Sequence, residues 1–209
     1  MNIALKIDVP IASFPTSRSR EYRDTYLVPP PSTVYGMLLS LVGETNRYKH
    51  CGVKIAIALL SEPAKSVTLR KIRRVKEKEI DHPHNSRPDF QEILTGIELM
   101  VWVDKGEDKA KPNLCDRITS AFINPSSLNR FGILCLGESR DLVNSVELID
   151  SIDLNLPLKY LIQDEYGDLS LPYWIDRIGS QDTRWLRYLI EEISQTTPPD
   201  SAWTTIGIT

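Results

Sequence analysis

The side chains that could do chemistry in this sequence are concentrated in two basic segments of its first half. Residues 14–26 carry three arginines and two tyrosines and follow neither a helical nor a strand period. Residues 65–79 carry seven basic side chains against two acidic ones. Cationic groups bind phosphates and aromatic rings stack on unpaired bases, so both segments are typical of a surface for single-stranded RNA. Solvated segments with internal ion pairs would have the same composition.

The histidines suggest a second kind of chemistry. Histidine can act as a general acid or base; His82 and His84 lie near basic residues, and His50 sits alone after Tyr48 and Lys49. The pair His82 and His84 could also ligate a metal, but no cysteine or carboxylate cluster completes a set. Flanking prolines place this pair in a turn rather than on a rigid strand. We therefore predict no catalytic residue, no metal and no cofactor.

Other functional signatures are missing from the sequence. It contains no Walker loop, no Gly-x-Ser-x-Gly elbow and no dinucleotide fingerprint. Cys51, Cys115 and Cys135 are odd in number and widely spaced, so we expect three reduced thiols. The apolar runs are too short for a bilayer, and the N-terminus lacks a basic segment followed by an apolar block. These features predict a cytoplasmic protein without a membrane partner.

The net charge of -3 hides an asymmetry along the chain. Residues 141–209 hold twelve acidic side chains against four basic ones, a balance of -8, which leaves +5 on residues 1–140. The first part is therefore the candidate binder of a polyanion. At 209 residues the chain suits one compact domain or a domain with an elaboration. We expect a basic domain over residues 1–140 and an acidic elaboration over residues 141–209, packed on it.

Alternating apolar residues predict the strands that would position these side chains. The alternation covers residues 2–9, 53–60 and 97–103. Residues 130–140 read as a fourth strand followed by a glycine turn. Between the second and third strands, residues 65–96 have too little apolar surface to join the core. We expect this segment to project as a basic β-hairpin, with turn residues at its tip, although a merely solvated hairpin is the alternative.

Proline and apolar spacing predict the helices. Pro29, Pro30 and Pro31 exclude a helix before Ser32, which is placed to cap a helix with an apolar stripe up to Val42. A second amphipathic helix is expected over residues 114–122, and a third after Asp182 in the acidic part. The first two helices and four strands follow the order β-α-β-β-α-β. This order predicts an α+β fold of the ferredoxin-like type, which RNA-recognition modules also use.

These landmarks together resemble a known family. The residues that carry the resemblance are Phe14 and Arg18, the run from Pro29 through Ser32 to Gly43, the basic arm over residues 70–78, and the turn over residues 132–139. The chain is similar over residues 1 to about 140 to the fifth CRISPR-associated family. Members of this family are RAMP-type (repeat-associated mysterious protein) subunits of type I Cascade complexes, and the likeness is greatest to type I-B-like members.

The resemblance implies an RRM-like domain with a hairpin thumb and an additional α/β elaboration at the C-terminus. It implies a non-catalytic subunit that grips the 5′ handle of the crRNA, caps the filament of backbone RAMP subunits and adjoins the large PAM-reading subunit. RNA-guided DNA targeting would then bring target DNA near the PAM close to the chain indirectly. The RNA-binding residues implied by position are Arg18, Arg20, Arg23 and Tyr26 beside the first helix, Ser32 and Thr33 at its start, Arg70, Lys71, Arg73, Arg74, Lys76 and Lys78 on the thumb, and Arg130, Ser139 and Arg140 near the glycine turn.

Two alternatives to this interpretation stay open. One branch of the resembled family, in type I-C systems, cleaves repeat RNA with a Tyr/Lys/His-type site, so a metal-independent endoribonuclease is the first. The second is a protein-only scaffold subunit, in which the basic arm binds an acidic partner protein.

Overall fold

The computed structural model describes residues 2–17, 19, 21–73, 75–150, 157–176 and 182–207. The strands are β1 (Asn2–Ala12), β2 (Tyr22–Arg23), β3 (Lys54–Leu59), β4 (Ala64–Arg73), β5 (Ser86–Asp104), β6 (Ser145–Ile149), β7 (Leu158–Gln163), β8 (Leu169–Ile175), β9 (Thr183–Ile193) and β10 (Thr204–Thr205). The helices are α1 (Pro31–Leu41) and α2 (Leu114–Ile123), with 3-10 turns η1 (Pro83–Asn85), η2 (Pro125–Ser127) and η3 (Asp200–Ala202).

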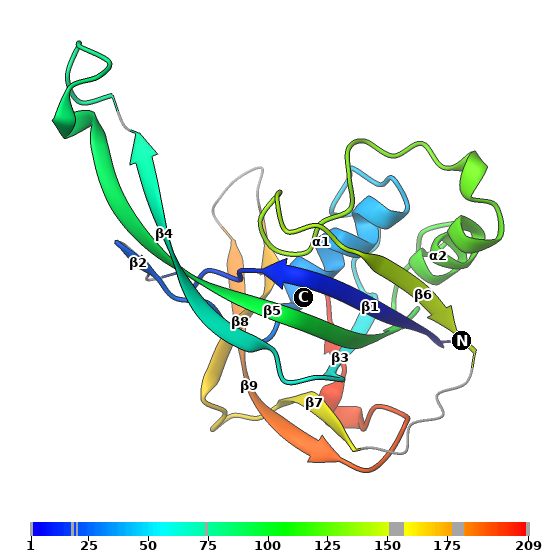
Figure 1. The fold of residues 1–209 in the computed structure, drawn as a ribbon. Helices are drawn as coiled ribbons and strands as arrows, with labels where there is room; N and C mark the ends of the chain where they lie inside the picture. Colours follow the sequence, from blue (N-terminus) through cyan, green and yellow to red (C-terminus); the bar gives the residue numbers. More distant parts are fainter. Residues whose placement is uncertain are drawn as a thin grey trace.

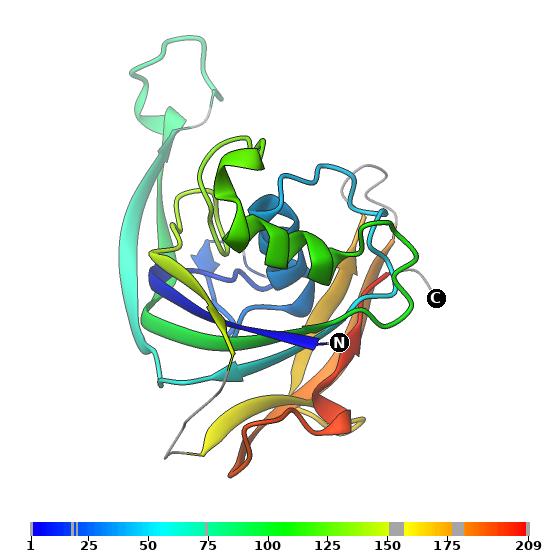
Figure 2. The same cartoon turned by 90° about the vertical axis from the view of Figure 1, so that its right-hand side faces the viewer.

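The described strands form one mostly antiparallel sheet. Its main path follows the order β6-β1-β5-β3-β7-β9-β8, and every pair on this path is antiparallel. The short strand β2 pairs with β5 in the parallel direction. Figure 2 shows α1 and α2 on the same side of the sheet, which bends around them. Neither helix in the described part of the chain is long and apolar enough to cross a membrane.

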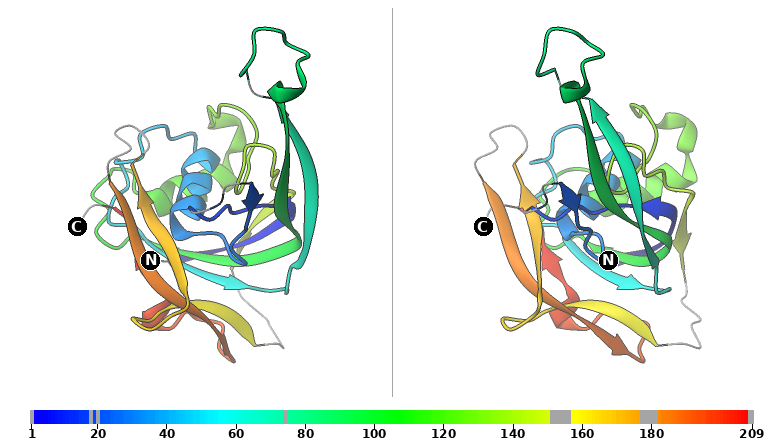
Figure 3. Two further views of the ribbon diagram at one scale, coloured as in Figure 1. Left: turned by 90° about the vertical axis from the view of Figure 1, so that its left-hand side faces the viewer. Right: turned by 60° about the vertical axis from the view of Figure 1, so that its left-hand side comes forward.

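The longest strand, β5, belongs to both the body of the sheet and a projecting arm. Its second half, from Ile97 to Asp104, lies between β1 and β3, where side chains such as Leu99 are fully buried. Its first half pairs with β4, from Ser86 opposite Arg73 to Thr95 opposite Ala64. Figures 1 and 3 show this two-stranded ribbon extending away from the body. We call residues 64–73 and 75–95 the arm.

Apolar side chains cover both faces of the middle of the sheet. On the helix side, Val34 and Leu38 of α1 pack into a core with Ile57 and Leu99, all at most 2% exposed. On the opposite side, Trp102 stacks on the fully buried Tyr160, with 5.4 Å between ring centroids. The strands predicted over residues 2–9, 53–60 and 97–103 and the first two helices are confirmed, because each has a regular apolar period.

The third predicted helix is wrong, because residues 183–193 form β9. This strand lies between β7 and β8 and contributes side chains to both cores: Leu186 and Ile190 pack toward the helix side, whereas Leu189 and Ile193 pack on the opposite side. A strand that is apolar on both faces can imitate helical spacing. The C-terminal part therefore contains strands and one 3-10 turn among its described residues, and the α/β elaboration expected there has no described α-helix.

Two further local predictions are corrected. The strand beside β1 is β6 and not residues 130–140, which form a loop with a single bridge between Cys135 and Leu142. Positive φ angles at Gly132 and Gly137 interrupt the extended backbone there. The first helix starts two residues earlier than expected, at Pro31 instead of after a Ser32 cap, with Pro30 in the capping position and no side-chain cap. Proline suits the first helical turn because its missing N–H would have no helical partner.

A buried polar network fixes α2 to the rest of the body. Asp108, 1% exposed, accepts hydrogen bonds from His50 Nδ1 at 2.8 Å and from the backbone N–H of Leu114 at 2.8 Å, at the start of α2. The other ring nitrogen of His50 accepts from Arg117 at 3.1 Å, and Arg117 also pairs with Glu44. His50 is 0% exposed and hydrogen-bonded on both ring nitrogens. It therefore has a structural role and is not an accessible catalytic base.

We expect Asp108→Ala to lower the free energy of unfolding by about 3–5 kcal/mol, because it leaves the His50 Nδ1–H and the Leu114 N–H without a buried acceptor. Urea unfolding monitored by circular dichroism measures this loss. The matched control is Glu107→Ala, which removes an exposed carboxylate from the same loop and should change stability by less than about 0.5 kcal/mol. Equal effects of the two variants would contradict the role given to the network.

Candidate nucleic-acid interface

The base of the arm gathers three arginines from three separate segments. Arg23 lies on β2 opposite Gln91, and Arg70 lies on β4 opposite Asp89. Paired residues on neighbouring strands point to the same face, so Arg23 and Arg70 share the face of β5 that carries Gln91. Arg140 reaches this face from the loop that follows Gly137. Its Nη2 donates to Gln91 Oε1 at 2.6 Å, and Arg70 Nη1 donates to the same oxygen.

All three arginines contact the carboxylate of Glu138. Arg23 Nη1 lies 3.1 Å from Oε1, Arg140 Nη2 lies 2.9 Å from Oε2, and Arg70 Nη1 lies 3.8 Å from Oε2. We call these four residues the arginine cluster. Their side chains are 22–49% exposed, so solvent and ligands reach them. Asp141 Oδ1 also lies 3.9 Å from Arg140 Nε, so three guanidinium groups face two carboxylates and leave one positive charge in surplus, in a geometry suited to oxygen anions.

The glycine turn that carries Glu138 is held against the end of β1. The buried carboxylate of Asp141 accepts the backbone N–H of Ser13 at 3.0 Å and that of Glu138 at 2.8 Å. Burial raises the pKa of Asp141, while these two hydrogen bonds act in the opposite direction. Gly137 has φ +114°, and a Cβ built there would lie 2.7 Å from Asp141 Oδ2 and 2.8 Å from the Ser13 carbonyl oxygen. The turn thus requires glycine and positions the cluster.

The opposite face of the arm base is organised by Glu92, which is 8% exposed. Its carboxylate accepts hydrogen bonds from Tyr22 Oη at 3.2 Å, the Thr25 N–H at 3.0 Å and Lys65 Nζ at 3.1 Å. Burial alone would raise the pKa of Glu92, but the hydrogen bonds from Thr25 and Lys65 outweigh it and the pKa is lowered. On the same face, Tyr22, Phe90 and Leu69 are cross-strand neighbours and are 44–64% exposed.

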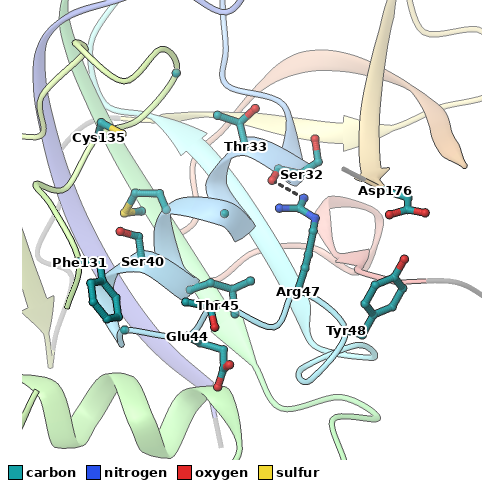
Figure 4. A pocket seen from close by; sticks show the side chains of 15 residues that line it. Ser32, Thr33, Ser40, Glu44, Thr45, Arg47, Tyr48, Phe131, Cys135 and Asp176 are labelled. Carbon is teal, nitrogen blue, oxygen red and sulfur yellow. Dashed lines mark hydrogen bonds between the residues drawn. The ribbon is translucent and has the colours of Figure 1, made fainter. Parts of the chain in front are cut away.

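A separate hollow of about 360 Å³ lies along α1 (Figure 4). Ser32 and Thr33 line one end, and Arg47 donates to the Ser32 carbonyl oxygen at 2.9 Å. The Arg47 guanidinium lies over the rings of Tyr35 and Trp174, 5.2 and 5.3 Å from their centroids. The Ser32 hydroxyl is buried and has no hydrogen-bond partner in the described chain. This hollow therefore combines an aromatic-backed cation with hydroxyl groups.

The other predicted RNA-binding residues are scattered. Arg18, Arg20 and Arg74 lie outside the described residues. Tyr26 is partly buried beside Phe14, and burial raises its pKa. The remaining cations are exposed, and Arg73 lies 3.6 Å from Asp81 near the tip of the arm. The remaining predicted residues in the described chain are Lys71, Arg73, Lys76 and Lys78 on the arm and Arg130 and Ser139 on the loop before Arg140.

Sequence reasoning did not find the acidic and polar partners of these cations. The pattern around Glu138 indicates only a glycine turn, and no motif marks Gln91, Glu92 or Arg47 as a partner of these cations. Glu138 lies 115 positions from Arg23 and 68 from Arg70, so no local spacing indicates the cluster. The alternation along residues 86–95 could have placed Gln91 on the arginine face, had β2 been known to pair with β5.

The histidine pair lies at the tip of the arm. The rings of His82 and His84 are 4.8 Å apart, and His84 Nδ1 lies 3.9 Å from Glu77 Oε1. The sequence offered no carboxylate to complete this pair, because Glu77 is one charge among many in a basic run. The structure corrects this point, since it brings Glu77, His82 and His84 together as a possible metal-ligating group.

Comparisons with known proteins agree on one family. A family model described as CRISPR-associated protein (Cas_Cas5) matches residues 2–107. A curated relative from Myxococcus xanthus (strain DK1622), the CRISPR-associated protein Cas5, is 35% identical over 194 residues, which cover 91% of each chain.

Solved structures show a similar fold. A chain of a CRISPR RNA-guided surveillance complex matches with a TM-score of 0.63 at 14% identity, covering 97% of this chain and 96% of that one. A crystal structure of a Cas protein matches with a TM-score of 0.59 at 15% identity, covering 92% and 95%. At these identities the likeness concerns the fold alone.

We expect Gly137→Ala to destabilise the protein by about 1–3 kcal/mol, because the added Cβ meets Asp141 and the Ser13 backbone at a strained φ. Gly132→Ala is the matched control: it also has a positive φ, of +73°, but nothing lies within 4 Å of its Cβ. Chemical unfolding of both variants separates close packing from φ strain. A loss at Gly137 no greater than that at Gly132 would show that the turn is not seated on β1.

Proposed function

Because the chain belongs to the CRISPR-associated Cas5 family, we propose that it is a non-catalytic RNA-binding subunit of a type I CRISPR Cascade complex that grips the 5′ handle of the crRNA. The observation that carries this proposal is the arginine cluster at the base of the arm. Arg23, Arg70 and Arg140 come from three segments and converge on one carboxylate, with their guanidinium groups partly open to solvent. Planar guanidinium groups bind phosphate oxygens in a bidentate manner, so this surplus of cations suits an RNA backbone.

The arm supports the proposal with a second set of contacts. Lys71, Arg73, Lys76 and Lys78 are exposed along it and would act as the thumb that contacts the guide where handle becomes spacer. Such contacts contribute affinity that falls with salt but carry little sequence information. Specificity for the handle needs unstacked bases, and the exposed Tyr22 and Phe90 rings on the opposite face of the arm base supply stacking surface.

The topology supports an RRM-like core for this function. The chain order β1-α1-β3-β5-α2-β6 and the strand order β6-β1-β5-β3 match a ferredoxin-like unit, to which the arm and strands β7 to β10 are additions. The predicted boundary near residue 140, between a basic domain and an acidic elaboration, stays a prediction. In this topology β6 would belong to the basic domain. The acidic surface of the added strands repels a polyanion, so we assign the binding of protein neighbours to this surface. These neighbours would be the backbone RAMP subunits and the large PAM-reading subunit. The complex would be cytoplasmic and would lie near target DNA.

We expect Arg70→Ala combined with Arg140→Ala to weaken binding of a crRNA with its 5′ handle about tenfold or more at moderate salt. Loss of two phosphate contacts should also change the slope of the logarithm of the binding constant against the logarithm of salt concentration. The slope should become less steep by about 1.4, at about 0.7 per contact. Fluorescence anisotropy across a salt series measures both quantities. The control is Lys159→Ala on β7, which removes a cation paired with Glu62 away from the arm and should leave both unchanged. An unaltered slope in the double variant would refute the cluster as an RNA site.

We expect purified protein to leave repeat RNA intact in EDTA, because none of the three histidines lies in the arginine cluster. Gel analysis of the RNA after incubation tests this expectation. Site-specific cleavage that His84→Ala abolishes would instead support the endoribonuclease. Co-purification with Cascade proteins without any affinity for RNA would support the protein-only scaffold.

A further inference from the structure

The tip of the arm holds three side chains with the chemistry of a metal site. Glu77, His82 and His84 each offer one ligand atom, and these atoms all lie within 4.8 Å of one another. Around a tetrahedral Zn²⁺, with bonds of about 2.0–2.2 Å, ligand atoms are roughly 3.3 Å apart. Glu77 and His84 are more than half exposed, so their side chains can rotate by this small amount without disturbing a core.

The backbone that carries these ligands is already held in place by Asn85, which is 4% exposed. Its Oδ1 accepts the N–H groups of Lys76 at 2.7 Å and Glu77 at 2.8 Å, while its Nδ2 donates to the carbonyl oxygens of Glu77 at 3.1 Å and Glu79 at 2.7 Å. These bonds tie the Glu77 side of the tip to the turn that carries the histidines. The ligands are therefore brought near one another before an ion binds.

The turn itself spaces the two imidazoles. Pro83 fixes the backbone between His82 and His84 as the first residue of η1. The hydrogen bond described for the His82 side chain is long, with its Nδ1 accepting the His84 N–H at 3.3 Å. A metal ion that takes this lone pair would replace a weak interaction with a strong one, so the ion would displace little existing structure.

The tip has no hydrophobic core that could hold it otherwise. Val75 is 95% exposed and Ile80 is 77% exposed, so their apolar side chains face water. Segments too small to bury an apolar core are commonly stabilised by a metal or a disulfide instead. The three cysteines lie outside the arm, so a disulfide is not an option at this tip.

We propose that Glu77, His82 and His84 form a site for a transition-metal ion of the Zn²⁺ class at the tip of the arm. Two imidazoles and one carboxylate favour zinc or its neighbours over magnesium or calcium, which prefer all-oxygen ligands. Three protein ligands leave a fourth position open to water. The ion would clamp the loop between residues 77 and 84. This site is independent of the RNA-binding proposal, because none of its ligands belongs to the arginine cluster.

The chain allows an unusually direct test of this site. It contains three histidines, and the third, His50, is 0% exposed and hydrogen-bonded on both ring nitrogens. Imidazole signals that respond to an added metal must therefore come from the tip. Titration of the full chain with Zn²⁺, followed by NMR of the histidine rings and by calorimetry, should give one ion per chain and selective shifts of His82 and His84.

The variants distinguish ligands from neighbours. Glu77→Gln and His84→Ala should each weaken Zn²⁺ binding by about tenfold or more, since losing even an outer-sphere partner of a metal commonly costs this much. Glu79→Gln is the matched control, as an exposed carboxylate of the same loop outside the group, and should bind like the unmodified chain. All three positions are exposed, and unfolding curves verify that each variant is folded.

A second readout follows the clamp itself. Trypsin cleavage after Lys76 and Lys78 should slow when Zn²⁺ is added, and Glu77→Gln should remove this protection. The proposal fails if Zn²⁺ leaves the His82 and His84 signals unshifted. It fails equally if Glu79→Gln weakens binding as much as Glu77→Gln. It also fails if Zn²⁺ still binds after both His82 and His84 are changed to Ala, because the ion would then be bound by the thiols.

Discussion

The rest of the structure depends on β5, a single strand that is hydrogen-bonded both in the body of the sheet and in the arm. Its second half lies in the middle of the sheet between β1 and β3, and its first half forms the inner strand of the arm. A two-stranded ribbon is marginally stable by itself in water. Because this ribbon extends a buried strand, the core fixes its direction and its face. The arginine face and the aromatic face at the arm base are thus placed by the same ladder that holds the body together.

Carboxylates give the basic surface its shape. Glu138 gathers three arginines, Glu92 ties β2 to the arm, and Asp141 seats the glycine turn on the end of β1. Without such partners, neighbouring guanidinium groups would repel one another and spread apart. The internal anions hold them at spacings suited to phosphate, but they also offset part of the attraction to RNA. This arrangement fixes the positions of the guanidinium groups at the expense of net charge, which suits the proposed recognition of one RNA end.

The sequence predicts this fold well where an element has one regular apolar period. β1, β3, α1 and α2 each show such a period and begin within two residues of the predicted positions, although β3 is buried on both faces. The prediction was wrong at β9, where Leu186 and Leu189 face different cores, and at residues 130–140, where Phe131 and Ile133 are exposed and form no strand. The arginines themselves were predicted from the family resemblance. Their convergence on Glu138 was not, because it depends on contacts across the whole sheet that no local spacing encodes.

The outer edge of β4 has a consequence for the free subunit. In the described chain β4 pairs only with β5, so its other side presents unpaired backbone groups over ten residues, a template on which a second molecule could add a strand and start aggregation. Lys65, Lys71 and Arg73 project from one face of this edge, and a second copy would bring like charges together. Lys71 and Arg73, proposed to contact a guide, would thus also oppose pairing of this edge between free subunits.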